Sequence, residues 1–232
     1  MELKGRLKLI ADKIPVCRTA CDIGTDHAYI PIYLVQKNIC EKVIASDVRI
    51  GPVEAARKNT CHYGLNGKIE VRLGNGLDTI AEEEAEAIII AGMGGTLISE
   101  IILRGIKLAR KAKYLVIQPM NDLEIVRKML LDNGFEIYDE ELTEEGTKLY
   151  NVICARWTGE KAIVEENIYY HIGRRLIEKN DPLLKFLISR KIVQLDRALE
   201  ELRNAKEMNR GVVDIYSALL KDLRKLKQGY LV

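Results

Sequence analysis

Short apolar runs alternate with amphipathic stretches through the first two thirds of the chain. The runs are rich in Ile, Val and Ala, which is typical of strands buried on both faces. They predict strands at 18–23, 42–47, 68–73, 87–91 and 113–118. The stretches around and between them predict helices at 2–13, 28–38, 51–64, 94–110 and 121–133. Strands separated by helices of this length indicate βαβ units and a parallel sheet.

Two further apolar runs, 134–142 and 147–156, are separated only by a short polar turn. No helix fits into that gap, so we expect an antiparallel hairpin at one edge of the sheet. The expected fold class is therefore α/β, a Rossmann-like sheet with an antiparallel closing hairpin.

From Thr158 onward the pattern changes to apolar spacings that alternate between four and three, as in a heptad repeat. The first series is Leu184, Ile188, Lys191, Leu195, Ala198, Leu202 and Ala205. After a break at 208–211 (MNRG), a second series follows: Val212, Tyr216, Leu219, Leu223 and Leu226. The two series predict an antiparallel, coiled-coil-like helical hairpin, joined to the sheet by a helix at about 162–178. We expect two domains, 1–157 and 158–232.

Composition narrows the class of protein. The chain has 232 residues, of which 30% are charged, and it shows neither a signal peptide nor an apolar run long enough to span a membrane; we expect it to be cytoplasmic. Its five cysteines form no CxxC pair and its three histidines lie far apart, so we expect no metal site. Residues 158–232 contain 15 basic and 11 acidic residues, which suggests a polyanionic partner.

The stretch CDIGTDHAYIP, residues 21–31, places Asp22, Asp26 and His27 where the first strand turns into a helix. In open α/β sheets, ligands bind at this end of the strands. Gly24 lets the backbone approach a ligand, but the turn lacks the GxGxxG pattern of a dinucleotide site, and its carboxylates would repel phosphate. A cationic ligand without phosphate fits better. S-adenosylmethionine, with its amine and sulfonium, is such a ligand.

Small or polar residues follow the other strands too. Asp47 lies about twenty residues after the turn, where an acidic side chain can bind ribose hydroxyls. Each acidic residue alone is equally consistent with a helix cap, but the whole series favours a ligand cleft. The expected cofactor-binding residues are Asp22, Gly24, Thr25, Asp26, His27, Asp47, Val48, Asn75, Gly76, Gly92, Met93 and Gly94.

Five stretches together resemble the bacterial tRNA (adenine-22-N1)-methyltransferases: DIGTDHAYIP, ASDVRIGPVEAARKN, GNGLD, IIIAGMGG and QPMND. The resemblance covers essentially the whole chain, including the C-terminal helical region. It implies a class I methyltransferase fold, S-adenosylmethionine as the methyl donor, and methylation of N1 of an adenine in the D-arm region of tRNA.

Within that family, we expect Asp26, His27 and Tyr29 to be catalytic, because they lie beside the methyl donor. The stretch 91–95 lacks the Asp/Asn-Pro-Pro-aromatic motif that holds an exocyclic amine, so methylation of the amino group is disfavoured. Its glycines would leave room for a flipped adenine. The expected substrate-binding residues are Gly95, Gln118, Asn121, Arg174, Arg175, Arg190 and Arg197.

Other functions stay open from the residues alone. A methyltransferase that acts on a small molecule or a protein fits the sheet equally well. A nonenzymatic protein that recruits partners through a coiled coil fits the C-terminal third. A nicotinamide-dependent oxidoreductase is disfavoured by the first turn. We expect a monomer or a weak homodimer.

Overall fold

The computed structural model describes residues 1–160, 166–204 and 209–229. The chain divides into two compact units, unit 1 (Met1–Ile163) and unit 2 (Val164–Val232).

Unit 1 is built on a seven-stranded sheet with the strand order β3-β2-β1-β4-β5-β7-β6. Its strands are β1 (Cys17–Ile23), β2 (Cys40–Asp47), β3 (Ile69–Leu73), β4 (Ala87–Met93), β5 (Tyr114–Pro119), β6 (Phe135–Glu145) and β7 (Lys148–Trp157). The first five strands are parallel, and β7 joins β5 in antiparallel register. The expected Rossmann-like sheet with an antiparallel hairpin at one edge is therefore confirmed.

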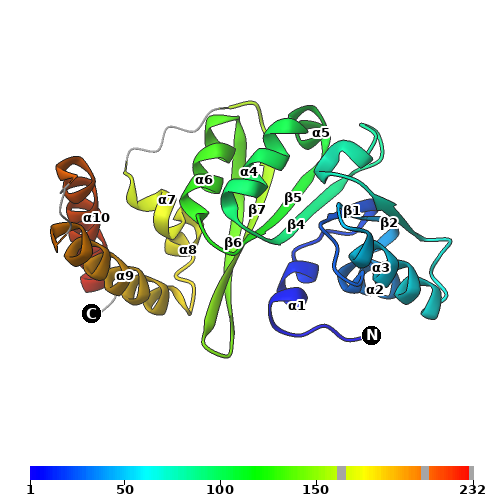
Figure 1. Ribbon diagram of the computed structural model, residues 1–232, viewed down its shortest axis with the longest axis horizontal. Coiled ribbons are helices and arrows are strands. Elements are labelled where there is room, and N and C mark those ends of the chain that lie inside the picture. Colours follow the sequence, from blue (N-terminus) through cyan, green and yellow to red (C-terminus); the bar gives the residue numbers. More distant parts are fainter. Residues whose placement is uncertain (161–165, 205–208, 230–232) are drawn as a thin grey trace. The chain divides into compact units, whose positions relative to one another are not determined.

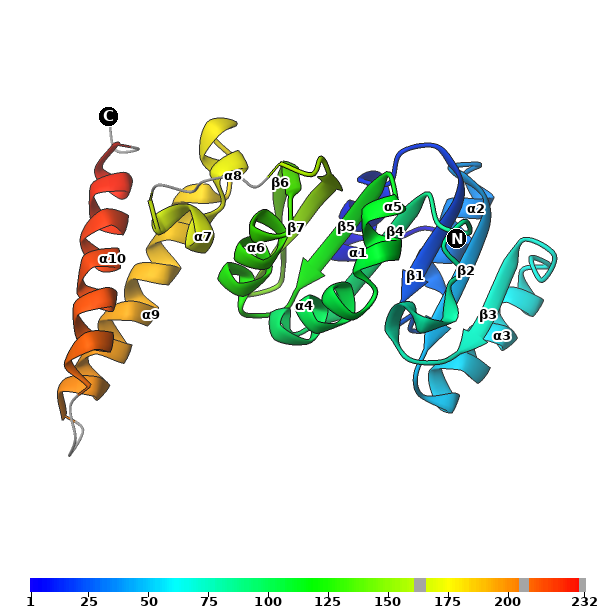
Figure 2. The ribbon, with the colours of Figure 1, turned by 90° about the horizontal axis from the view of Figure 1, so that it is seen from above.

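Helices cover both faces of this sheet (Figures 1 and 2). One core layer contains apolar residues of α1 (Gly5–Asp12), α2 (Tyr29–Gln36) and α3 (Ile50–His62). The other contains residues of α4 (Gly95–Arg104), α5 (Ile106–Lys111) and α6 (Leu123–Asp132). Between them, Ile88, Ile89 and Ile90 are fully buried, which explains why this strand reads as a continuous apolar run.

Two local features of unit 1 differ from the sequence-based prediction. The helix expected at 94–110 is split at Gly105, where a side chain would come within 2.6 Å of Leu77. Leu77 belongs to a short 3₁₀ helix, η1 (Gly76–Thr79), which the sequence pattern did not reveal. The close packing of η1 against the end of α4 therefore replaces one long helix by two shorter ones.

Unit 2 consists of helices in its described part: α7 (Ile168–Ile172), α8 (Arg174–Glu178), α9 (Leu184–Asn204) and α10 (Arg210–Gly229). The helix expected at about 162–178 is divided at Gly173, and its first residues, 162–165, lie outside the described residues. Helices α9 and α10 pack side by side (Figure 2).

The packing between α9 and α10 follows the expected heptad series only in part. Leu184, Ile188 and Leu195 are buried as expected, but Leu199 is buried in place of its neighbour Ala198. On α10 the buried residues are Leu219, Leu220 and Leu223. The expected position Ala205 lies outside the described residues, as does Met208, the first residue of the expected break. The C-terminal region is helical, and coiled-coil geometry stays a prediction.

A buried ion pair fastens α6 to the hairpin. Arg127 Nε donates to Glu140 Oε1 over 2.8 Å, and Arg127 Nη2 donates to Asn151 Oδ1 over 2.5 Å. The side chains of Arg127 and Glu140 are each only 1% exposed. At such a place the charges must be paired, because an isolated buried ion is very costly.

We expect Arg127→Met to lower the free energy of unfolding by about 3–5 kcal/mol, because it leaves the Glu140 carboxylate buried without its cation. Chemical denaturation measures this loss. The matched control is Arg156→Met, which removes a half-exposed ion pair with Glu136 and is expected to cost no more than about 1 kcal/mol. Equal losses in the two variants would contradict the assignment.

Candidate functional site

The turn after β1 is fixed to the end of β2 by its backbone. The N–H groups of Gly24 and Thr25 both donate to the carbonyl of Ser46, over 2.7 and 2.8 Å. Gly24 has φ +78°, and a Cβ at this position would lie 1.9 Å from the methyl group of Met93. Glycine is therefore favoured by the backbone conformation, and any side chain here would displace the end of Met93.

Two acidic side chains are buried at this edge of the sheet. Asp22 is the last but one residue of β1, in register with Ala45, and Asp47 is the last residue of β2; both are 6% exposed. Burial raises the pKa of Asp22 to about 6, and the charge of Asp47 adds to that rise, whereas the nearby Thr25 hydroxyl opposes it. Such a carboxylate favours a cationic ligand, because a positive charge would offset the cost of ionising it.

The surroundings of these carboxylates offer further polar groups. Asp47 Oδ1 accepts a hydrogen bond from the Arg49 backbone N–H over 2.8 Å. The hydroxyls of Thr25 and Ser46 are buried, and in the described part of the chain neither has a hydrogen-bond partner of good geometry. Buried polar atoms without a partner are uncommon in folded proteins and call for a ligand or a water.

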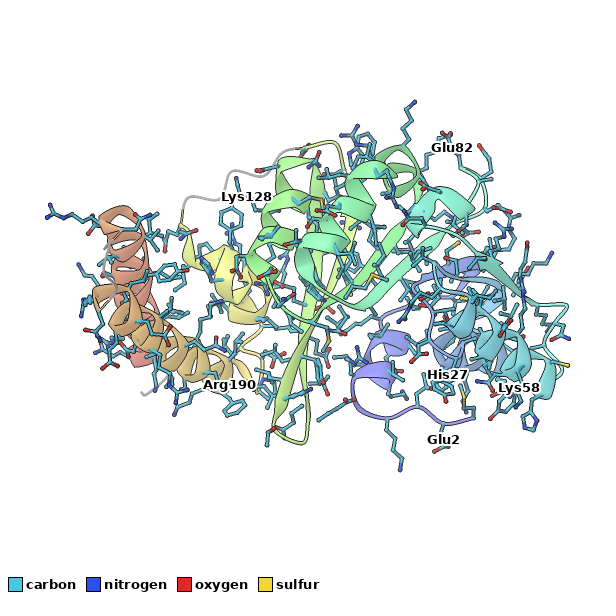
Figure 3. The ribbon with its side chains drawn as sticks, viewed as in Figure 1. Glu2, His27, Lys58, Glu82, Lys128 and Arg190 are labelled. Atoms are coloured by element: carbon cyan, nitrogen blue, oxygen red, sulfur yellow. The ribbon has the colours of Figure 1, made fainter. Side chains whose placement is uncertain are left out.

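Asp26, His27 and Tyr29 form an exposed cluster at the start of α2. The His27 ring stacks on the Tyr29 ring at 5.3 Å between centroids, and His27 Nε2 lies 3.4 Å from Asp26 Oδ1. Figure 3 shows His27 on the outside of unit 1, beside α2 and α3. The three residues expected to be catalytic therefore lie together at the start of α2; their catalytic role stays a prediction.

The backbone that presents His27 is strained. Both His27 and Ala28 have φ between 50° and 60°, a region that residues with a side chain seldom occupy. Asn59 Nδ2 on α3 donates to the His27 carbonyl over 2.9 Å and holds this conformation. Strain of this kind, held by neighbouring groups, is concentrated at functional sites. The sequence analysis did not identify Asn59.

The ends of β2 and β3 combine an apolar and a polar surface. Val48, next to Asp47, is 62% exposed, which suits contact with a flat aromatic ring. Asn75 follows β3, and its Oδ1 accepts a hydrogen bond from Arg104 Nη2 on α4 over 2.9 Å. The same guanidinium would lie within 2.8 Å of a side chain at Gly76. Arg104 therefore fixes this loop. The sequence analysis did not identify Arg104 either.

At the ends of β4 and β5, polar side chains bind backbone groups. Gln118 is fully buried, and its Oε1 accepts hydrogen bonds from the Gly92 N–H and from Arg6 Nη1 on α1. Asn121 Oδ1 accepts from the Gly95 N–H over 3.2 Å. These contacts make Gln118 and Asn121 supports of the loop after β4. Whether they also contact a substrate stays a prediction.

The glycines after β4 do not all serve one purpose. A side chain at Gly95 would lie 2.4 Å from the carbonyl oxygen of Asp122, so glycine there permits close packing of α4. Gly94 faces Asn121 Oδ1, 3.0 Å from the position of a Cβ, whereas Gly92 is approached only by Arg6 Nη1 at 3.2 Å. Of these three glycines, Gly92 and Gly94 are therefore the ones consistent with the predicted space for a base, whereas Gly95 serves the packing of α4.

The basic residues predicted to bind substrate lie on unit 2. Arg174 and Arg175 both donate to Glu178, over 2.9 and 2.8 Å, which offsets part of their charge. On α9, which carries Arg190 (labelled in Figure 3), the Arg190 guanidinium stacks over the Phe186 ring, and the exposed Arg197 lies two helical turns further along.

These residues fit S-adenosylmethionine. Asp22 offers a buried negative charge for its amine, Asp47 a carboxylate for its ribose hydroxyls, and Val48 an apolar surface for its adenine. The described residues contain no group of three or more His, Cys, Asp or Glu side chains placed to hold a metal ion. No helix within them is long and apolar enough to cross a membrane.

Comparison with known proteins gives the family. Residues 3–153 match the family model "Methyltransferase domain". The tRNA (adenine(22)-N(1))-methyltransferase of Bacillus subtilis is 37% identical over 173 residues, which cover 75% of this chain and 72% of the relative.

Similarity to solved structures supports the same family. The crystal structure of the B. subtilis m1A22 tRNA methyltransferase TrmK superposes with a TM-score of 0.88 at 29% identity and covers 97% of this chain and 99% of its own. M. capricolum TrmK, solved in complex with the cofactor product S-adenosyl-homocysteine, gives a TM-score of 0.82 at 26% identity and covers 98% and 99%. The resemblance of the five sequence stretches is thereby confirmed, and the chain belongs to the tRNA (adenine(22)-N1)-methyltransferase family.

Proposed function

We propose that this protein transfers a methyl group from S-adenosylmethionine to N1 of adenine 22, in the D-arm region of tRNA. The observation that carries the proposal is the pair of buried carboxylates, Asp22 and Asp47, at the sheet edge of a chain whose relatives are tRNA m1A22 methyltransferases. The carboxylate pair favours a cationic methyl donor, and the activity of the relatives indicates the acceptor.

In this proposal the first half of the sheet edge binds the donor. Asp22 binds the amine and Asp47 binds the ribose hydroxyls, while Val48, Asn75 and Gly76 surround the adenine. Gly24, Thr25, Met93 and Gly94 line the methionine part. When bound, S-adenosylmethionine supplies an electrophilic methyl group on a sulfonium. The residues of the chain hold the acceptor in line with it.

The acceptor chemistry needs little acid–base assistance. Adenine N1 has an in-plane lone pair that forms the new N–C bond while the C–S bond breaks, and the cationic product loses an amino proton afterwards. Asp26 and His27 orient the base and take up that proton, and Tyr29 forms a wall of the pocket. Most of the rate therefore comes from alignment and exclusion of water.

We further propose the organisation around this reaction. Residues 1–157 form the donor-binding domain, and residues 158–232 form a coiled-coil-like hairpin that binds the RNA backbone through Arg174, Arg175, Arg190 and Arg197. The protein acts in the cytoplasm as a monomer or a weak homodimer.

We expect methyl transfer from labelled S-adenosylmethionine to unmodified tRNA, with N1-methyladenosine as the product nucleoside, identified by mass spectrometry. A tRNA with guanine in place of adenine 22 is the control and should accept no label. Donor binding without transfer to tRNA would favour a small-molecule or protein acceptor instead.

The affinity for S-adenosylmethionine should increase as the pH rises from 5 to 7. The raised pKa of Asp22, about 6, means that this carboxyl is neutral at the lower pH and ionised at the higher, and only the ionised form attracts the amine. We expect Kd to fall about tenfold across this range, as measured by calorimetry. Asp22→Asn should weaken binding and remove this pH dependence, and His27→Gln should keep it. A pH-independent Kd in the wild type would contradict the role of Asp22.

His27→Ala should lower kcat about tenfold or more, because it removes the stacked ring beside the methyl donor, while the unfolding transition changes little for this half-exposed side chain. Asn59→Ala should produce a similar loss, since Asn59 fixes the strained backbone of His27. Single-turnover kinetics measure both. Lys58→Ala, the exposed neighbour on α3 (Figure 3), is the matched control. Wild-type turnover in the His27 variant would remove His27 from the catalytic group.

A further inference from the structure

Arg6 on α1 places a positive charge at the ends of β4 and β5. Its Nη1 donates to Gln118 Oε1 over 2.7 Å, and its guanidinium lies over the Tyr150 ring at 5.3 Å from the ring centroid. Gln118 Oε1 also accepts the Gly92 N–H. Arg6 is thus connected to the loop that is proposed to receive the acceptor base.

The start of α1 is fixed by the β6–β7 hairpin, which extends beyond the rest of the sheet (Figure 1). The Arg6 backbone N–H donates to Glu145 Oε1 over 2.5 Å. At Gly5, φ is +50° and a Cβ would lie 2.2 Å from the same oxygen, so glycine favours this contact and a side chain there would displace Glu145. The Glu145 carboxylate, from a strand distant in sequence, therefore caps the first turn of α1. This contact fixes the position from which the Arg6 side chain extends.

One edge of the Arg6 guanidinium has no acceptor. In the part of the chain that the structure describes, no carboxylate pairs with Arg6, neither Nε nor Nη2 makes a hydrogen bond, and Nε is buried. The charge of Arg6 is thus not offset by a carboxylate of the described residues, and its Nη2 can donate a charge-assisted hydrogen bond to an oxyanion.

The strand order indicates which anion this is. The switch point lies between β1 and β4; Asp22 and Asp47 occupy the β1–β2 side, whereas the contacts of Arg6 come from β5 and β7. The acceptor side of the site faces RNA, in which a phosphate flanks every nucleoside, and phosphate contacts position a nucleic acid. We propose that Arg6 binds the phosphate next to the target adenosine and thereby positions the base for transfer. This inference rests on the proposed function.

The test compares Arg6→Gln and Arg6→Lys with the wild type. For Arg6→Gln we expect kcat/KM for tRNA to fall about tenfold or more, and the slope of log Kd for tRNA against log salt to decrease by about one. The Kd for S-adenosylmethionine should stay within about twofold. Arg6→Lys keeps the charge but not the planar fork, so it should restore the salt slope while kcat/KM stays below that of the wild type.

Arg110→Gln is the matched control. Arg110 on α5 also stacks over an aromatic ring, that of Trp157 at 5.8 Å, but it is exposed and is none of the residues proposed to bind the donor or the tRNA. All three measurements should match the wild type. A loss equal to that of Arg6→Gln would mean that any surface arginine has this effect, and it would overturn the proposal.

The outcomes separate the two claims. If the wild type forms no N1-methyladenosine in tRNA, the proposed function fails. If it does, and Arg6→Gln keeps both kcat/KM and the salt slope, only the assignment of Arg6 is overturned. A weaker affinity for S-adenosylmethionine with unchanged tRNA kinetics also overturns it, because Arg6 would then bind the donor's carboxylate. Should Arg6→Gln fail to fold, an unchanged kcat/KM in Arg6→Lys overturns the proposal.

Discussion

The carboxylates of Asp22 and Asp47, buried close together, are the constraint on which the site depends. Burial and the nearby charge of Asp47 both oppose the ionisation of Asp22, and its pKa, raised from 3.8 to about 6, corresponds to a cost on the order of 3 kcal/mol. Strands β1 and β2 lie inside the sheet with core layers on both faces, which fixes the backbone that carries these side chains. A cationic donor offsets this cost, which makes the site selective for positive charge.

The parallel sheet turns this local constraint into a complete site. Because β1 to β5 run in one direction, every strand ends at the same edge, and each following loop contributes to one surface. The loops are then fixed by side chains from other elements: Asn59 holds the His27 carbonyl, Arg104 holds Asn75, and Gln118 holds Gly92. The residues expected to contact ligands are therefore positioned by neighbours that need not contact any.

The distinction between residues that contact ligands and residues that position them explains what the sequence could predict. The strands, Asp22 and Asp47 follow from local patterns, because an apolar run and the residue after it are adjacent in the chain. Arg6 and Gln118 are 112 residues apart and Arg6 and Glu145 are 139 apart, so no local pattern relates them. The split at Gly105 likewise depends on Leu77, which packs against it from a different segment. The heptad series gave the right helices but not all the buried positions, because Leu199 and Leu220 lie off its regular spacing.

The choice of N1 as the acceptor atom has a consequence for how the RNA must be bound. N1 lies on the Watson–Crick edge, so it is inaccessible while the adenine is paired or stacked, and the base must leave the stack at a cost of a few kcal/mol. The loop after β4 carries glycines and no aromatic residue that would stack on the extruded base. The energy for extrusion must therefore come from contacts to the RNA outside the pocket, chiefly to phosphates. This requirement favours a basic residue beside the acceptor base, as proposed for Arg6, together with a separate helical unit that has an excess of basic residues.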